Sequence, residues 1–144
     1  FEWAWSIRPS QPLTAGVWFM DYPEINAYQL EHSDVISFHN YSDTTSMKKT
    51  IDSLRKRGRP LICTEYMART NNSKFQTHLP LLKRYGVAAI NWGLVSGKSN
   101  TIFPWGSKEN SPEPDPWFHD VFRIDGTPYD KKETELIRRL TKER

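Results

Sequence analysis

The stretch Pro60–Met67, with the sequence PLICTEYM, decides how the rest of this chain is interpreted. Apolar and β-favouring residues lead directly into an acidic residue, and Pro60 suits the first position of a strand. The two-residue period of a strand predicts that Leu61, Cys63 and Glu65 share one face. A carboxylate at the end of a buried strand is costly to desolvate unless it is hydrogen-bonded, so Glu65 is a candidate for a chemical role. The simpler alternative for a single Glu is a side chain that points into solvent.

Composition and charge restrict the class of protein. The chain has 144 residues, of which 37% are hydrophobic and 13% aromatic, with six Trp. This length suits one domain or a piece of a larger one. The net charge of +3 comes from 20 basic and 17 acidic residues, and the two signs are mixed along the chain. A nucleic-acid interface would gather basic residues in one stripe, so we expect no nucleic-acid partner.

The cysteine and histidine content argues against a metal site. Cys63 is the single cysteine, which excludes an internal disulfide and a cysteine-based zinc site, and we interpret it as a small core residue. The remaining histidines, His32, His78 and His119, lack the spacing of metal ligands and are expected in surface or capping roles. We therefore expect no metal and no other cofactor. No apolar run is long enough to span a membrane, so no membrane partner is expected either.

Apolar stretches that we interpret as strands alternate with helical patterns along the chain. The expected strands are Leu13–Trp18, Asp34–Tyr41, Leu61–Glu65 and Val87–Leu94. The expected helices lie at about 21–33, 42–57, 73–85 and 130–142, and in the first of them Ile25 and Tyr28 should face inward. This alternation predicts βα units on a parallel sheet. No glycine-rich nucleotide motif follows any of the strands, which disfavours a nucleotide-binding fold.

The ends of the expected strands carry side chains that suit a binding site. The four ends place Trp18, then His39 with Tyr41, then Glu65, and then Trp92. Functional groups of a parallel sheet gather at the carboxyl ends of its strands. The repeated pattern is therefore more informative than Glu65 alone, and it favours a functional site at this edge of the sheet.

Four segments of the sequence resemble a known family. They are PLTAGVW at 12–18, DVISFHNY at 34–41, TEY at 64–66 and INWGLV at 90–95. From about Ser6 to Leu140 the chain is similar to retaining glycoside hydrolases of clan A, which includes the cellulase-like family 5 enzymes and the family 2 β-glycosidases. The resemblance implies an α/β fold, the C-terminal half of a (β/α)8 TIM barrel. Residues 1–144 would then form a partial catalytic domain of about four βα units, strands five to eight, without the N-terminal half.

The same resemblance implies roles for individual residues. Glu65 matches the catalytic nucleophile, and His39 and Tyr41 match the strand-six pair in which the tyrosine hydrogen-bonds the nucleophile. Trp92 matches the tryptophan platform for the sugar at the cleaved bond. Further substrate contacts are expected from Trp18, Trp105 and Asn40. The chemistry agrees with these roles, because a hydroxyl donor favours an ionised carboxylate and an indole face fits the apolar side of a pyranose.

One part of the family pattern has no counterpart in this sequence. The Asn-Glu pair that supplies the general acid/base would lie upstream of Phe1, and retention of configuration requires two carboxyl groups. The N-terminal residues Phe1–Arg8 show neither an initiator Met nor a signal-peptide pattern, so we expect further sequence upstream. We expect a secreted or periplasmic location from the family resemblance.

The expected function is hydrolysis of a β-linked polysaccharide or oligosaccharide. This chain would carry the nucleophile half of the site and would be inactive alone, and its partner would be the N-terminal half of the barrel or a second half-barrel. The alternative is a non-catalytic carbohydrate-binding or structural half-barrel, in which the aromatic residues bind sugar and Glu65 only hydrogen-bonds it.

Overall fold

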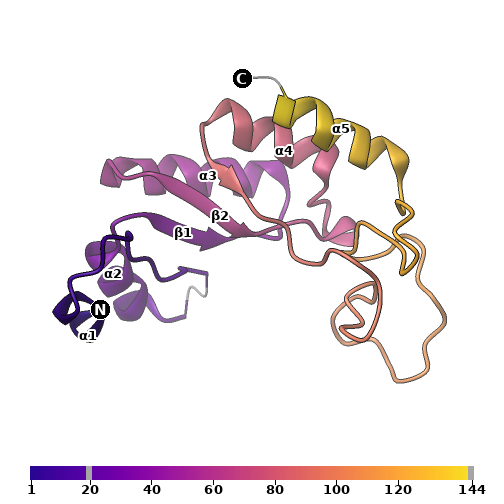
Figure 1. The fold of residues 1–144 in the computed structure, drawn as a ribbon, viewed down its shortest axis with the longest axis horizontal. Coiled ribbons are helices and arrows are strands. Elements are labelled where there is room, and N and C mark those ends of the chain that lie inside the picture. Colours follow the sequence, from indigo (N-terminus) through magenta and orange to yellow (C-terminus); the bar gives the residue numbers. More distant parts are fainter. Residues whose placement is uncertain (19–20, 143–144) are drawn as a thin grey trace.

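The computed structural model describes residues 1–18 and 21–142. Its elements in chain order are α1 (Glu2–Ser6), α2 (Pro23–His32), β1 (Ile36–His39), α3 (Thr44–Leu54), the 3-10 turn η1 (Arg55–Arg57), β2 (Leu61–Glu65), the 3-10 turn η2 (Arg69–Asn71), α4 (Phe75–Arg84), β3 (Ala88–Ala89) and α5 (Lys131–Lys142). The three strands form a parallel sheet in the order β1-β2-β3 (Figure 1). The chain is therefore a mixed α/β structure with a small parallel sheet, as the alternating pattern predicts.

One face of the sheet is covered by helices and holds the core. Ile36 pairs with Leu61 and Phe38 pairs with Cys63, so these four side chains share a face, and none is more than 6% exposed. Helices α3 and α4 lie over this face, and α5 lies beside α4 (Figure 1). The helix residues that the sequence pattern places inward are buried there, namely Met47, Ile51, Leu54, Phe75 and Leu82. The 3.6-residue period of the two helices thus supplies the apolar side that the strands require.

Helix α3 begins and ends where its sequence signals predict. The Asp43 carboxylate accepts a hydrogen bond of 2.9 Å from the backbone N–H of Ser46, which satisfies one of the free donors of the first turn. After η1 the chain reverses at Gly58, which has the left-handed φ of 67° that glycine adopts without strain. These two signals set the length of the helix that covers β1 and β2.

A buried ion pair attaches α5 and the 117–120 segment to the turn that follows β2. The Arg69 guanidinium donates to both Glu133 oxygens, at 3.0 and 2.6 Å, and the two side chains are 5% and 3% exposed. Arg69 also donates to the backbone carbonyls of Trp117 and Asp120. All of the charge is therefore balanced by a bidentate partner, as a buried guanidinium requires. One side chain joins the turn after β2, the 117–120 segment and α5.

The first expected strand, Leu13–Trp18, is reduced to a single bridge. Only Val17 pairs with β1, opposite Phe38, through hydrogen bonds to the backbone of Ser37 and His39. The preceding backbone donors are used differently, because Leu13 N–H donates to the Asp34 carboxylate and Ala15 N–H to the Ser33 hydroxyl. Side-chain acceptors thus compete with the sheet ladder, and the expectation of a regular strand here is wrong.

The fourth expected strand, Val87–Leu94, is also shorter than the pattern suggests. Only β3 pairs regularly with β2, although Ile90 and Trp92 still donate to the carbonyls of Cys63 and Tyr66. The spacing of these two bonds departs from a regular parallel ladder, because β2 ends at Glu65 and Met67 turns away with a φ of 75°. The segment therefore follows β2 to the end of the sheet without remaining a strand.

Helix α2 differs from the expectation in its orientation. The residues expected to face inward, Ile25 and Tyr28, are 56% and 46% exposed, whereas Leu30 packs partly against the core. The helix has almost no segregation of apolar residues, so its sequence specifies no single inner face. Together with α1 it lies beyond β1 (Figure 1).

Candidate active site

An irregularity in β2 sets the direction of Glu65. The register between the strands runs from Phe38 opposite Cys63 to His39 opposite Glu65, so β2 contains one more residue than β1 at this point. An extra residue of this kind reverses the alternation of faces and can redirect a side chain. Cys63 is fully buried in the core, but Glu65 lies with His39 on the opposite face. The prediction that Leu61, Cys63 and Glu65 share one face is therefore wrong for Glu65.

The Glu65 carboxylate meets two groups from the end of β1. The Tyr41 hydroxyl donates to Oε2 at 2.7 Å, and His39 Nδ1 lies 3.3 Å from the same oxygen. Burial, together with the hydrogen bond to Glu65 and its charge, raises the pKa of Tyr41 well above its usual value. Tyr41 therefore stays protonated and keeps donating its hydrogen bond to the Glu65 side chain. Both contacts use Oε2, so among the described residues Oε1 is the carboxylate oxygen left for a ligand.

These groups lie in a pocket of about 710 Å³ at the carboxyl ends of the strands. Its lining residues are Trp18, His39, Tyr41, Ser42, Glu65, Asn71, Trp92 and Trp105. The three indoles are 63%, 46% and 61% exposed, so each can offer an aromatic face to a ligand. The Trp18 ring is stacked with the His39 ring at 6.3 Å and 25°. The structure thus brings together six of the seven residues that the sequence singles out.

Trp105 reaches this pocket from the long loop between β3 and α5, which projects beyond the strand ends (Figure 1). Its ring lies edge-on to Tyr41, with centroids 4.9 Å apart and an interplanar angle of 89°, and edge-on to Phe118 at 4.8 Å. The loop folds back on itself, and the Phe118 and His119 N–H groups donate hydrogen bonds to the carbonyls of Ile102 and Thr101. Trp105 is therefore held between the end of β1 and the 117–120 segment.

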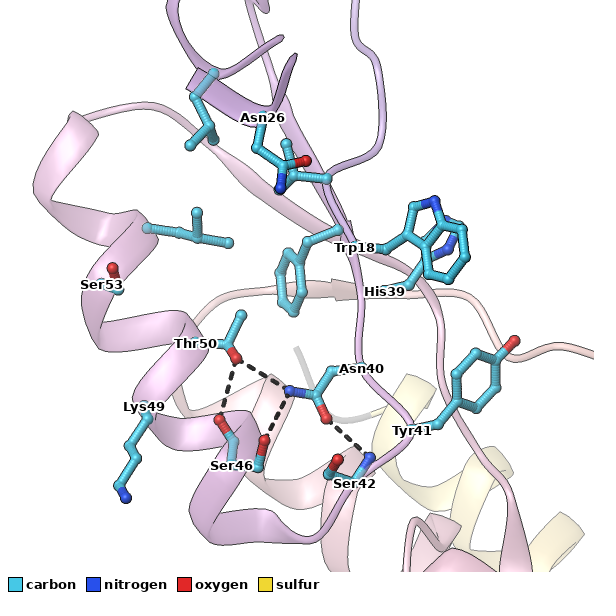
Figure 2. A pocket seen from close by; sticks show the side chains of 14 residues that line it. Trp18, Asn26, His39, Asn40, Tyr41, Ser42, Ser46, Lys49, Thr50 and Ser53 are labelled. Atoms are coloured by element: carbon cyan, nitrogen blue, oxygen red, sulfur yellow. Dashed lines mark hydrogen bonds between the residues drawn. The ribbon is translucent and has the colours of Figure 1, made fainter. Parts of the chain in front are cut away.

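Asn40 is the seventh residue, and its side chain lies elsewhere. Its amide nitrogen donates to the hydroxyls of Ser46 and Thr50 in α3, and its oxygen accepts from the Ser42 N–H. Figure 2 shows Asn40 pointing toward α3 while Tyr41 points the opposite way. The surrounding pocket, of about 560 Å³, lies between β1, α2 and α3. Asn40 attaches the end of β1 to α3, and the residues described around Glu65 do not include it.

His78 and His119 are buried rather than exposed, which corrects part of the expectation for them. His78 is fully buried and has a capping role, because its Nδ1 accepts from the Lys74 N–H at the start of α4. His119 is 1% exposed and contacts the Tyr41 and Trp105 rings, so it lies behind two of the residues that line the site. Burial lowers the pKa of both histidines. The WFHD sequence at 117–120, which is rich in aromatic residues, was the available signal, but its position depends on contacts distant in the chain.

Between residues 1–18 and 21–142, no group of three or more His, Cys, Asp or Glu side chains is arranged to hold a metal ion. Within the same residues, none of the helices has the length and apolar character needed to cross a membrane. Comparison of the sequence with protein-family models and with curated proteins gives no match to either.

Proposed function

We propose that this chain carries the nucleophile half of a retaining glycoside hydrolase site for β-linked polysaccharides or oligosaccharides. The observation that carries the proposal is the 2.7 Å hydrogen bond from the Tyr41 hydroxyl to Glu65 Oε2, inside a pocket bordered by indoles. A half-buried carboxylate held by a neutral donor, with its second oxygen accessible, has the properties of a nucleophile toward an anomeric carbon.

The chemistry can be written for the residues of this chain. Oε1 of Glu65 attacks the anomeric carbon, a carbon–oxygen bond to the enzyme forms, and the bond to the leaving oxygen breaks while that oxygen takes a proton from an acid. Water then attacks the same carbon, gives up a proton to the conjugate base of that acid, and releases Glu65 as a carboxylate. Tyr41 supports both steps because its hydrogen bond fixes Oε2 and leaves Oε1 free to react.

The aromatic lining supports a sugar as the substrate class. Trp18, Trp92 and Trp105 border the pocket from three different segments, and each is more than 40% exposed. Indole faces pack against the apolar C–H face of a pyranose, and polar side chains such as His39 and Asn71 at the same pocket can orient its hydroxyls. A pocket of about 710 Å³ is large enough for more than a single small group.

The second carboxyl group must come from outside this pocket wall. Glu65 is the only carboxylate among the described residues that line the pocket, whereas retention requires two carboxyls about 5–5.5 Å apart. We propose that the general acid/base is contributed by the N-terminal half of a barrel or by a second half-barrel. These 144 residues alone should therefore show no useful turnover of aryl β-glycosides.

The direct test is the Glu65→Gln substitution in this chain, measured in the complete protein or complex that also contains the second carboxyl group. Gln keeps the shape of the side chain but cannot form the glycosyl-enzyme bond, so turnover should be lost while sugar binding remains. A 2-fluoro-glycoside with an activated leaving group should label Glu65 covalently in the unchanged protein, as mass spectrometry of the digested protein would show. The matched control is Glu109→Gln, which changes an exposed carboxylate of the long loop. In this variant Glu65 should be labelled as in the unchanged protein.

The outcomes separate the two readings of the pocket. Unchanged turnover in the Glu65→Gln variant would exclude Glu65 as the nucleophile. Sugar binding without turnover or labelling in the unchanged protein would instead support the non-catalytic carbohydrate-binding alternative. Trp92→Ala should weaken sugar binding and rate together in an active enzyme, because it removes a stacking surface and leaves the reactive group in place.

A further inference from the structure

His119 lies behind the wall of the pocket, where it is bonded to the turn that follows Glu65. Its Nδ1 is 2.6 Å from the carbonyl oxygen of Met67, and because a carbonyl only accepts, Nδ1 carries the proton. Met67 has a left-handed φ of 75°, which is uncommon for a residue with a side chain. The hydrogen bond therefore ties His119 to a constrained turn only two residues beyond Glu65.

The imidazole also supports two side chains that face the pocket. The ring centroid of His119 is 5.6 Å from that of Tyr41 and 5.5 Å from that of Trp105, and the Tyr41 and Trp105 centroids are 4.9 Å apart. The three rings thus contact one another in pairs. Tyr41 and Trp105 line the pocket, whereas His119 is only 1% exposed and fills the space behind them.

The segment that contains Trp92 and Gly93 packs closely against His119, and this packing requires the glycine. Gly93 follows the pocket residue Trp92 and has a φ of 80°, and a Cβ added there would lie 2.7 Å from the Cβ of His119. That separation is shorter than side chains tolerate, so any other residue would move one of the two segments. The three segments that carry Tyr41, Glu65 and Trp92 therefore all approach this histidine, through Tyr41 itself, Met67 and Gly93.

The protonation state of the ring follows from its surroundings. Nε2 is buried and has no hydrogen-bond partner among the described residues, so a protonated ring would bury a second N–H without an acceptor. Burial also lowers the pKa of His119. The ring is therefore neutral, with one N–H that donates to Met67 and one uncharged edge next to the aromatic side chains.

We propose that His119 is a positioning residue that holds the Tyr41 hydroxyl on Glu65 and the Trp105 ring against the pocket. The inference rests on the function proposed above for Glu65. His119 reaches neither the substrate nor the reacting atoms, and it acts by occupying the space into which the Tyr41 ring would otherwise rotate. Its bond to the Met67 carbonyl keeps that spacer in register with the end of β2.

The variants that test the proposal separate the ring from its hydrogen bond. His119→Ala removes both, His119→Phe keeps a ring of similar size but cannot donate to Met67, and His119→Asn keeps a donor but leaves the space behind Tyr41 empty. Leu82→Ala, a fully buried residue of α4, is the control for loss of stability without a change in the pocket. Guanidinium chloride unfolding of each variant reports its stability separately from the measurements below.

The first measurement does not depend on catalysis. Burial raises the pKa of Tyr41 and Tyr66 strongly and that of Tyr129 less, so three of the six tyrosines should ionise above the ordinary value in the unchanged protein. In His119→Ala and His119→Asn, ultraviolet absorbance should show one additional tyrosine ionising near the ordinary value of 10.0. Adding Tyr41→Phe should remove this extra ionisation, and His119→Phe and Leu82→Ala should titrate like the unchanged protein. Native-like titration of both the Ala and the Asn variants would overturn the proposal; if Ala does not fold, the Asn and Phe pair decides.

The second measurement is the rate at which a 2-fluoro-glycoside labels Glu65 in the complete protein. A shift of a supporting group by about 1 Å can slow such a step about 100-fold, so we expect a 10- to 100-fold decrease in His119→Ala, with most of the rate restored by Phe. Equal labelling rates in the Ala variant and the unchanged protein would overturn the positioning role. Absence of labelling in the unchanged protein would instead contradict the proposed function, and the tyrosine titration would still decide the role of His119.

Discussion

The two faces of the small sheet differ in what their side chains do. On the helix-covered face, Ile36, Phe38 and Cys63 are at most 1% exposed and contact α3 and α4 side chains. On the opposite face, His39 and Glu65 are 22% and 24% exposed and meet Tyr41 at the pocket. The first face follows the strand period throughout, whereas the second depends on the extra residue in β2 that redirects Glu65. The comparison places the core and the proposed active site on opposite sides of the same strands.

The largest effect should come from emptying the helix-covered face. Phe38→Ala removes a fully buried ring from the core and should lower the free energy of unfolding by about 3–5 kcal/mol. Denaturant unfolding measures the loss, and Glu65→Gln on the opposite face serves as the comparison. A loss of less than about 1 kcal/mol for Phe38→Ala would show that α3 and α4 do not hold this face as described.

Removal of the Tyr41 hydroxyl should have the opposite effect, with a large decrease in the rate of Glu65 labelling and little change in stability. Tyr41→Phe deletes the donor to Glu65 Oε2 and should slow covalent labelling of Glu65 about 10- to 100-fold, equivalent to roughly 1.4–2.7 kcal/mol in the barrier. The free energy of unfolding should change by less than about 1.5 kcal/mol, because the bond is only part-buried. Labelling at the native rate would contradict the role assigned to this hydrogen bond.

A smaller effect is expected at the start of the helix that covers β1. Asp43→Ala removes the acceptor for the Ser46 N–H and should lower the free energy of unfolding by about 1 kcal/mol. Asp43→Asn and Asp43→Ser retain an acceptor and should recover most of the loss. Thermal unfolding of the three variants gives the comparison, and an unchanged midpoint for Ala would argue that another group caps the helix.

The smallest effect should be a pH dependence of the free energy of unfolding, to which His78 and His119 both contribute. Burial lowers the pKa of His78, which caps α4, and of His119, which supports the pocket, below the usual 6.5. The unfolded chain therefore binds more protons than the folded one in the range just below 6.5, and stability should be complete above it and fall as the pH is lowered. Denaturant unfolding between about pH 7.5 and 5.5 measures this slope, and His78→Asn and His119→Asn should each reduce it. A slope that survives both substitutions would assign the effect to other groups.

Local patterns account for the parts of the fold that were predicted correctly. The strand period and the helix period placed β1, β2, α3 and α4, and the buried residues Met47, Ile51 and Leu82 followed from the same patterns. Regular strands at Leu13–Trp18 and Val87–Leu94 were wrong. For the first segment, the periodicity does not reveal that side chains such as Asp34 and Ser33 compete for its backbone donors. For the second, it does not reveal that β2 ends at Glu65 and that Met67 turns away.

The residues that line the pocket were likewise only partly predictable from local sequence patterns. Sequence reasoning and the family resemblance pointed to Glu65, Tyr41, His39 and three indoles, and the structure places them around one pocket. The resemblance was needed to suggest roles, since residue spacing alone predicts only that strand ends meet. Asn40 is one residue from Tyr41, yet its side chain turns to α3, because consecutive residues of an extended chain point in opposite directions (Figure 2).

The sequence by itself determined the order of β1, α3, β2 and α4, the buried faces of α3 and α4, and the presence of a carboxylate at the end of β2. These properties depend on residues a few positions apart, whose periodicity and capping signals can be read directly. The tertiary structure alone decided the face on which Glu65 lies, since the extra residue in β2 is defined only against its partner strand. It also decided the place of His119, whose bond to Met67 joins residues 52 positions apart. No local pattern encodes such a contact, because it forms only when the sheet, the long loop and α5 have packed together.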